Sequence, residues 1–184
     1  KNNLFNTNSE SEIDVFVHCW DKEFKEEIDF LYKPKCSSYT GTENVKNKIG
    51  DKKISERVFT QLNNWYSIME SVNQMRNYEK ENNFKYDLVL IARFDVGLLI
   101  PIDFSKHKLD LTNIFYHSGP DPIHGVGCKC FRCEPTSPRY EIPDLWFFSN
   151  SDNIFNFSRV FQENDCEYFM RLNSNHVIGA RKVK

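Results

Sequence analysis

The sequence predicts an α/β protein in which a mostly parallel sheet is flanked by helices. Short runs of β-branched and aromatic residues alternate with helical patterns along the chain, which is the element order of such sheets. One run, YDLVLIARFD at residues 86–95, is apolar almost up to its charged end, as is typical of a strand buried on both faces. The 184 residues, of which 40% are hydrophobic, suffice for one domain with its own core.

The first third of the chain has a strand–helix–strand pattern between two polar segments. We expect a strand at 13–18 (IDVFVH), a helix from Asp21 through Phe30, and a second strand at 29–35 that Pro34 ends. Residues 1–11 and 36–53 contain few apolar side chains and are predicted to be loops.

The rest of the chain begins with the clearest helical pattern. Apolar residues recur at spacings of three and four over 54–82, which predicts one long helix. Further elements are expected at 86–93 (strand), 96–100 (apolar stretch), 114–117 (strand), 145–148 (strand), 150–161 (helix capped by Asn150, Ser151 and Asp152), 166–172 (helix) and 177–178 (strand).

Composition excludes several classes of protein. The net charge of −2 shows no basic excess, so a nucleic-acid partner is not expected. No apolar run approaches the roughly 20 residues of a transmembrane helix, and no signal peptide is visible, which predicts a cytoplasmic protein. Six cysteines in this length do not have the density of a disulfide-stapled module.

The end of the 86–95 run is the first candidate site. In open parallel sheets, ligands bind beyond the carboxyl ends of the strands, where Arg93 and Asp95 are expected to lie. Arginine can hold phosphate in a bidentate fork, and aspartate can hold a divalent cation. A salt bridge at the strand end explains the same residues equally well.

Two further segments carry residues suited to catalysis or phosphate binding. Asp144 opens an apolar strand, where an unpaired carboxylate is unfavourable, so it either caps the preceding loop or acts as a general base. Near the C-terminus, His176 can ligate a metal, Gly179 permits close backbone approach, and Lys182 can neutralise phosphate. A terminal strand with a solvated basic tail is the alternative for that segment.

Residues 118–143 form a long loop rich in Cys, Gly and Pro, of a length that is usually functional or disordered. His124, Cys128, Cys130 and Cys133 fall within ten residues and could form a tetrahedral zinc site. Such a site would have a structural role, because four protein ligands leave no open position. Free thiols and a disulfide remain alternatives.

The order of several motifs resembles a group of small glycosyltransferases of the GT-A type found in bacteria and large DNA viruses. The resemblance rests on five segments, namely Asp14–Asp21, Tyr32–Lys35, Gln61–Ser67, Tyr86–Asp95 and Asp144–Phe148. It implies a Rossmann-like sheet, a UDP- or GDP-linked sugar donor, and a glycan or protein acceptor. It also implies Mn²⁺ or Mg²⁺ as cofactor and, for a viral protein, a location in the host cytoplasm.

The resemblance also assigns roles to single residues. Asp95 corresponds to the last aspartate of the Asp-x-Asp metal motif, while Arg93 replaces the first and could hold the diphosphate itself. His176, Gly179 and Lys182 match a His-x-x-Gly-x-x-Lys motif in which His completes the metal site and Lys holds the diphosphate. Asp144 is expected to be the base of an inverting enzyme, or to position the acceptor in a retaining one.

Nothing that resembles the first nucleotide-binding strand of these enzymes precedes Ile13, so the chain is expected either to lack that strand or to have it reorganised. Two alternative functions remain open. One is a non-catalytic binding module stabilised by zinc at residues 124–133. The other is a nucleotidyltransferase-like enzyme that handles phosphate through the same Arg93 and Asp95.

Overall fold

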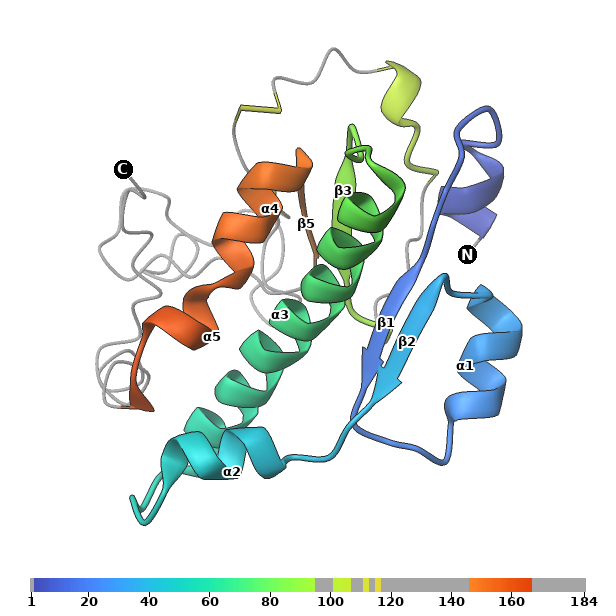
Figure 1. Cartoon of the computed structure of the whole chain (residues 1–184). Coiled ribbons are helices and arrows are strands. Elements are labelled where there is room, and N and C mark those ends of the chain that lie inside the picture. Colours follow the sequence, from blue (N-terminus) through green and yellow to red (C-terminus); the bar gives the residue numbers. More distant parts are fainter. Residues whose placement is uncertain (1, 95–100, 107–110, 113–114, 117–145, 167–184) are drawn as a thin grey trace, which may run out of the picture.

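A long central helix, α3 (Glu56–Asn82), organises the computed structural model, which describes residues 2–94, 101–106, 111–112, 115–116 and 146–166. In Figure 1 it crosses the middle of the molecule, between strands β1 and β2 on one side and helices α4 and α5 on the other. It contacts all four of these elements and α2 as well.

The sequence explains why α3 forms and where it ends. Its buried residues repeat at intervals of three and four, which makes one apolar stripe. The Ser55 hydroxyl accepts a hydrogen bond from the Val58 N–H at 3.3 Å and so caps the first turn. Asn83, with a φ of 55°, ends the helix in the left-handed conformation. The helix predicted at 54–82 is therefore confirmed.

The first sheet is a parallel pair that is joined through a helix. Strand β1 (Phe16–Cys19) is followed by α1 (Lys25–Tyr32) and then by β2 (Cys36–Tyr39), which pairs with β1 from Phe16↔Cys36 to Cys19↔Tyr39. The strand predicted at 29–35 is wrong, because α1 continues to Tyr32. Its first turn is held by an ion pair between Lys25 and Asp29, one helical turn apart.

The segment predicted to be a loop at 36–53 also contains regular structure. It forms β2 and then helix α2 (Glu43–Ile49), which Gly50 ends with a φ of 59°. Strand β2 is polar and depends on backbone pairing with β1. Helix α2 buries one side chain, Val45, which is 0% exposed, and Ile49 packs against the core only in part. Neither feature leaves a periodic apolar pattern in the sequence.

The second sheet overturns the predicted fold class. Strands β3 (Val89–Ala92), β4 (Phe115–Tyr116) and β5 (Trp146–Ser149) pair in the order β3-β5-β4, and both pairings are antiparallel. Within the described residues, no ladder joins β3 to β1, so the fold is a mixed α/β arrangement of two small sheets and not a Rossmann-like GT-A sheet.

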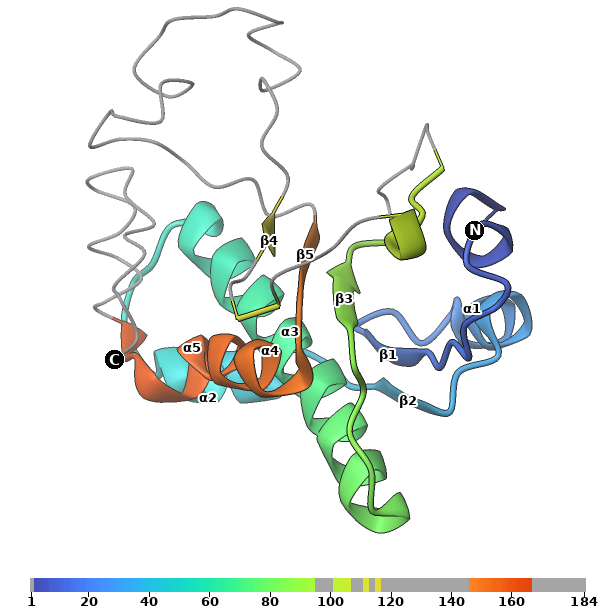
Figure 2. The same cartoon turned by 90° about the horizontal axis from the view of Figure 1, so that it is seen from above.

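The strand at residues 86–93 is also shorter and more exposed than expected. Val89, Leu90 and Ile91 are half-buried, and Ala92 is exposed. An apolar run predicts a strand but does not reveal its neighbours or their direction, which is why the expected parallel sheet is wrong. Figure 2 shows β1 and β2 beside α1, with β3 separating them from β4 and β5.

Helices α4 (Ser151–Ser158) and α5 (Val160–Glu163) follow β5 and cover α3. The predicted cap is confirmed, because the Asn150 side chain accepts from the Asn153 N–H at 2.8 Å. The single helix expected at 150–161 is interrupted by a turn at Arg159. Buried residues form two core clusters along α3, one around Leu62 and Phe161 and one around Val72 and Ile154.

The N-terminal segment is held in place and not frayed. After a π-helical turn, η1 (Asn2–Asn6), the Asn8 side chain donates to the Ile102 carbonyl at 2.7 Å and accepts from the Phe104 N–H at 3.0 Å. Phe104 begins a 3₁₀ turn, η2 (Phe104–Lys106). None of the helices in the described ranges is long and apolar enough to cross a membrane.

Candidate functional site

The antiparallel pairing of β3 with β5 brings two predicted site segments to the same end of the sheet. Ala92, the last residue of β3, pairs with Trp146, the first residue of β5. The chain continues from Ala92 through Arg93 toward Asp95, and it reaches Trp146 from Asp144. Asp95 and Asp144 themselves lie outside the described residues. The sheet thus joins the two motifs by a different pairing from the parallel one expected.

Arg93 lines an open groove against the N-terminal turns of α3. The groove has a volume of about 430 Å³, within the usual range for ligand sites. Its other described lining residues are Glu56, Arg57, Thr60, Gln61 and Asn64. Two guanidinium groups from different elements therefore share one groove with one carboxylate, two amides and a hydroxyl.

The groove contains a buried acceptor without a donor. Among the described residues, the Gln61 side-chain oxygen has no hydrogen-bond partner, although it is buried. Leaving such a group unpaired costs about 1–3 kcal/mol. Because this oxygen is buried, it is not accessible to a ligand in the open groove.

A second polar cluster lies at the carboxyl end of β1. His18 is 7% exposed and uses both ring nitrogens: Nδ1 lies 3.0 Å from Ser67 Oγ and Nε2 lies 2.8 Å from Thr40 Oγ1. Burial lowers the pKa of His18 to about 4, so the ring is neutral near pH 7. One ring nitrogen donates and the other accepts, and each hydroxyl can adapt to either role.

The contact between His18 and Ser67 has the distance of a base and its nucleophile, but its surroundings do not favour that role. A base with a pKa of about 4 is weak at neutral pH, and Thr40 cannot stabilise an imidazolium as a carboxylate would. Since both ring nitrogens are engaged by hydroxyls, none remains for a pair with Cys19. The cluster instead fixes β1 and β2 against α3.

Aromatic rings extend this cluster along α3. Trp20 lies edge-on to His18 at a centroid distance of 4.9 Å and contacts Tyr66 at 5.3 Å. The Tyr66 hydroxyl accepts a hydrogen bond from Asn44 on α2. Trp20 therefore has a structural position next to the core, and the described contacts do not assign it to a ligand.

The other predicted segments are connected by contacts near the starts of β1 and β3 and after the end of β3. Asp14 accepts a hydrogen bond from the Tyr86 hydroxyl at 2.6 Å and pairs with Lys35 at 3.4 Å. Burial and the bond to Asp14 raise the pKa of the Tyr86 hydroxyl, which remains protonated. Tyr32 meets Phe94 at a centroid distance of 5.5 Å. Four of the five segments that carry the resemblance are thus joined by side-chain contacts, and β5 joins the fifth to β3 by backbone pairing.

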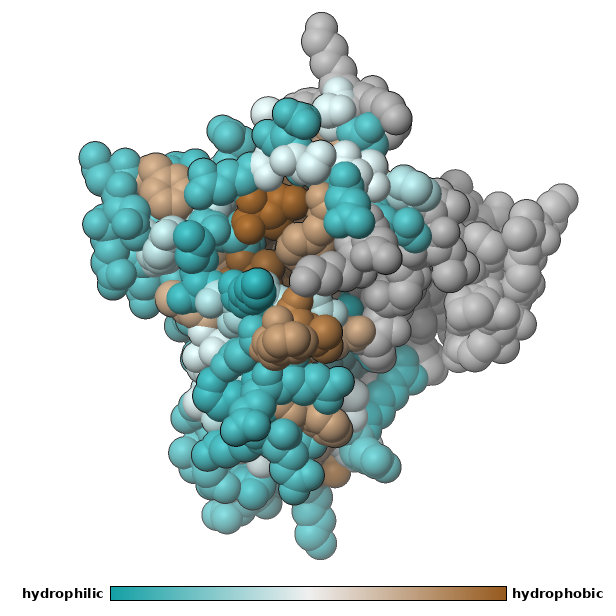
Figure 3. All heavy atoms as spheres, turned by 90° about the vertical axis from the view of Figure 1, so that its right-hand side faces the viewer, coloured by the Kyte–Doolittle hydropathy of each residue, from teal (hydrophilic) through white to brown (hydrophobic). Residues whose placement is uncertain are grey.

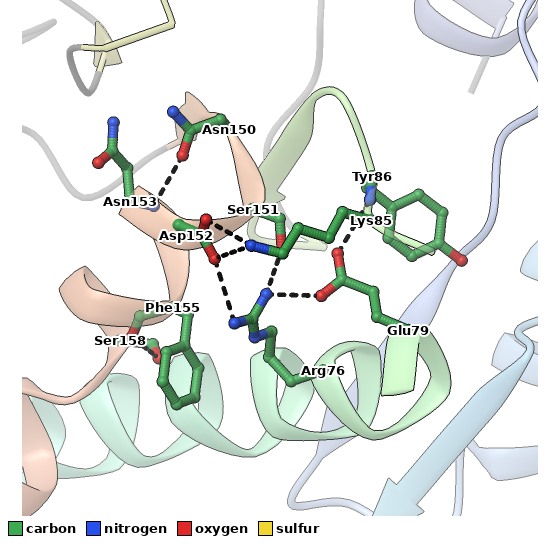
Figure 4. Close-up of polar contacts among 10 residues, drawn as sticks. All are labelled: Arg76, Glu79, Lys85, Tyr86, Asn150, Ser151, Asp152, Asn153, Phe155 and Ser158. Carbon is green, nitrogen blue, oxygen red and sulfur yellow. Dashed lines mark hydrogen bonds and ion pairs between the residues drawn. The ribbon is translucent and has the colours of Figure 1, made fainter. Parts of the chain in front are cut away.

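A separate ionic cluster holds the C-terminal half of α3 and is shown in Figure 4. Arg76 pairs with Glu79 at 2.8 Å and with Asp152 at 3.1 Å, and it donates to Ser151 at 3.1 Å. Glu79, which is 2% exposed, also accepts from the Tyr86 N–H at 2.9 Å. Each described charge has an opposite partner, which indicates a structural role.

Lys85 completes this cluster from the loop that precedes β3. Its ammonium group lies 2.6 Å from the nearer carboxylate oxygen of Asp152. Hydrogen bonding and the charges of Lys85 and Arg76 lower the pKa of Asp152. The groove at this end of α3 is lined by Arg76, Glu79, Lys80, Asn83, Phe84 and Lys85.

Apolar side chains are exposed on the side of the molecule that carries α1. Figure 3 looks onto this side and shows apolar residues gathered near its centre, bordered by hydrophilic ones. Exposed apolar residues include Phe30 and Leu31 on α1 and Phe94 after β3, which is 49% exposed. Phe94, which follows Arg93, contacts Tyr32 at the end of α1.

The predicted metal ligands cannot be compared with the structure. Asp95 and His176, predicted for Mn²⁺ or Mg²⁺, lie outside the described residues, as do Gly179 and Lys182. The same holds for the candidate zinc ligands His124, Cys128, Cys130 and Cys133, for the loop at 118–143, and for the elements expected at 96–100 and 177–178 and in most of 166–172. Searching only the described residues finds no group of three or more side chains suited to hold a metal ion.

Comparison with known proteins identifies no relative: no family model, no curated protein and no solved structure matches the chain. The groove residues of α3 were not predicted as site residues, although Gln61 and Asn64 belong to a segment that carries the resemblance. A signal was nevertheless present, because Arg57, Thr60, Gln61 and Asn64 follow the i, i+3, i+4, i+7 spacing of one helix face. This face is polar beside the apolar stripe that identified the helix.

Proposed function

We propose that the protein is a glycosyltransferase that moves a sugar from a UDP- or GDP-linked donor to a glycan or protein acceptor. The observation that supports this most is the pairing of Ala92 with Trp146 beside Arg93. It joins the strand that leads into the Arg93–Asp95 motif to the strand that follows Asp144. The proposal retains the site residues predicted from the sequence and the expected cytoplasmic location, but not the GT-A fold.

Sugar transfer requires that negative charge be stabilised on the departing nucleoside diphosphate. Arginine and lysine side chains can supply this stabilisation electrostatically, and Arg93 has the required charge and an exposed position. A divalent cation held by Asp95 and His176 would supply the same stabilisation when bound. Lys182 is the second proposed phosphate ligand.

The acceptor hydroxyl must lose a proton as it attacks the sugar. In our proposal Asp144 accepts this proton if transfer inverts the configuration at the sugar, and positions the acceptor if transfer retains it. The proximity of the β3 and β5 ends supports a role for both motifs in one reaction.

Isothermal titration of UDP- and GDP-sugars, with and without Mn²⁺, tests the donor site. We expect binding that Asp95→Ala weakens in the presence of Mn²⁺ and that Arg93→Gln weakens in both conditions. Loss of product formation in Asp144→Asn, with donor binding unchanged, would support its role toward the acceptor. Absence of donor binding by the intact chain would exclude the proposal, and tight binding of plain nucleotides with nucleotidyl transfer would favour the alternative enzyme class.

A further inference from the structure

We propose that the groove between Arg93 and the first turns of α3 binds the diphosphate group of a nucleoside diphosphate, with Arg57 and Arg93 as its phosphate ligands. The identification of the ligand as a nucleotide sugar's diphosphate rests on the proposed function. The assignment of Arg57, Thr60, Gln61 and Asn64 to the site comes from the geometry of the groove.

The charges in the groove favour an anion. Arg57 from α3 and Arg93 from the end of β3 both line it, while Glu56 is the one acidic residue among its described lining side chains. Guanidinium groups bind phosphate oxygens in pairs, and two such groups on different elements can contact two successive phosphates.

The position of the groove on α3 adds to this preference. Its lining residues occupy the first three turns of a 27-residue helix. The N-terminal end of a helix carries partial positive charge, which stabilises anions within its first turn, here beside Glu56 and Arg57. The groove therefore combines two side-chain charges with the favourable end of the longest helix described.

The polar side chains of the groove suit the hydroxyl groups that flank a diphosphate in a nucleotide sugar. Thr60 and Asn64 offer a hydroxyl and an amide on the same helix face as Arg57. The groove, of about 430 Å³, is open to solvent, so a bound diphosphate would remain partly exposed.

Titration calorimetry with UDP, GDP and inorganic pyrophosphate, in EDTA and then in Mn²⁺, tests the groove in the full chain. We expect Arg57→Gln to raise the Kd of the compounds that bind by about 10- to 100-fold in both conditions, as expected for losing a charge-assisted hydrogen bond. Arg57→Lys is expected to restore part of the affinity, because it keeps the charge and loses the bidentate geometry.

A nearly isosteric variant tests the groove independently of Arg57. Asn64→Asp places a carboxylate beside the phosphates and is expected to weaken binding by about 10-fold through repulsion. Asn77→Asp, at an exposed position on the other half of α3, controls for the added charge. Arg159→Gln controls for the lost arginine, since Arg159 is exposed and pairs with Glu163 at 3.1 Å.

The outcomes separate this inference from the proposed function. Nucleotide binding that changes less than about twofold in Arg57→Gln and Asn64→Asp would exclude the groove and leave the transferase intact. Pyrophosphate binding that depends on Arg57, without sugar transfer from any donor, would support the groove and contradict the transferase. If none of the three compounds binds, both proposals are wrong.

Discussion

The two halves of α3 present arginine in opposite ways. In the C-terminal half, Arg76 contacts two carboxylates and a hydroxyl, and its principal partner Glu79 is buried. In the N-terminal half, Arg57 is exposed and lines a groove together with Arg93. Arg76 also lines a groove, but the contacts given for it are with acidic and hydroxyl groups that hold α3 to α4. The groove at the other end differs because it places two arginines from different elements together.

Among the predicted changes in the free energy of unfolding, replacement of Arg76 should give the largest. It therefore tests most directly whether Arg76 has a structural role. In Arg76→Ala the buried Glu79 loses its partner, which is expected to lower the free energy of unfolding by about 3–5 kcal/mol. Urea unfolding measures the change. Arg159→Ala, which removes an exposed ion pair, should cost less than about 1 kcal/mol. If Arg76→Ala lowered the free energy of unfolding as little as Arg159→Ala, the ion pairs of Arg76 would not be important for stability.

The pH dependence of stability tests whether His18 belongs to the structural part of α3. The pKa of His18 falls from 6.5 to about 4 on folding, so the unfolded chain binds its proton at higher pH than the folded protein. Its stabilising contribution is complete above pH 6.5 and is lost as the pH decreases toward about 4. At about 1.4 kcal/mol per pKa unit, the loss reaches about 3 kcal/mol.

Unfolding curves of the wild type and of His18→Gln between pH 7 and pH 4 isolate this contribution. We expect the free energy of unfolding of the variant to depend much less on pH in this range, whatever its absolute stability. Glu70, whose pKa burial raises, titrates in both proteins and cancels in the comparison. Asp152 has a lowered pKa and loses its contribution below the usual aspartate range. The same pH dependence of stability in both proteins would show that folding does not lower the pKa of His18.

The helix caps provide a smaller comparison between the two ends of the molecule. Asn150 accepts from the Asn153 N–H at 2.8 Å and donates to the Leu111 carbonyl at 2.6 Å, while Ser55 makes a single cap bond of 3.3 Å. Thermal unfolding should show a loss of about 1–2 kcal/mol for Asn150→Ala and about 0.5–1 kcal/mol for Ser55→Ala. A larger loss for Ser55→Ala than for Asn150→Ala would indicate that the cap of α3 contributes more to stability than the cap of α4.

The smallest expected effect is on stability when Arg57 is replaced. Because Arg57 is exposed, Arg57→Gln should change the free energy of unfolding by less than about 0.5 kcal/mol in urea. A stable variant that no longer binds a diphosphate would complete the contrast with Arg76. A loss of more than about 2 kcal/mol would instead assign Arg57 to the fold.

The sequence predicted the elements whose signals are local. The apolar period of α3, the Asn150 cap and the strands near 13–18, 86–93 and 145–148 are properties of neighbouring residues, and each is found in the structure. Helix α2 was missed because it is short and polar, and its two core-facing apolar side chains, Val45 and Ile49, do not make a recognisable period.

The candidate site was only partly predictable for the same reason. Arg93 was identified from its place at the end of an apolar run, whereas Arg57 lies 36 positions earlier in a helix that its apolar face had already explained. Their common groove depends on where the end of β3 lies relative to the first turns of α3. No pattern within either segment predicts that arrangement.

By itself, the sequence determined where the chain forms α3 and the principal strands, because periodicity and capping act over a few residues. Only the tertiary structure decided that β3 pairs antiparallel with β5, that Arg76 pairs with two acids, and that Arg57 and Arg93 line the same groove. These outcomes depend on contacts between distant segments, whose energies are set by packing and burial and not by the identity of adjacent residues.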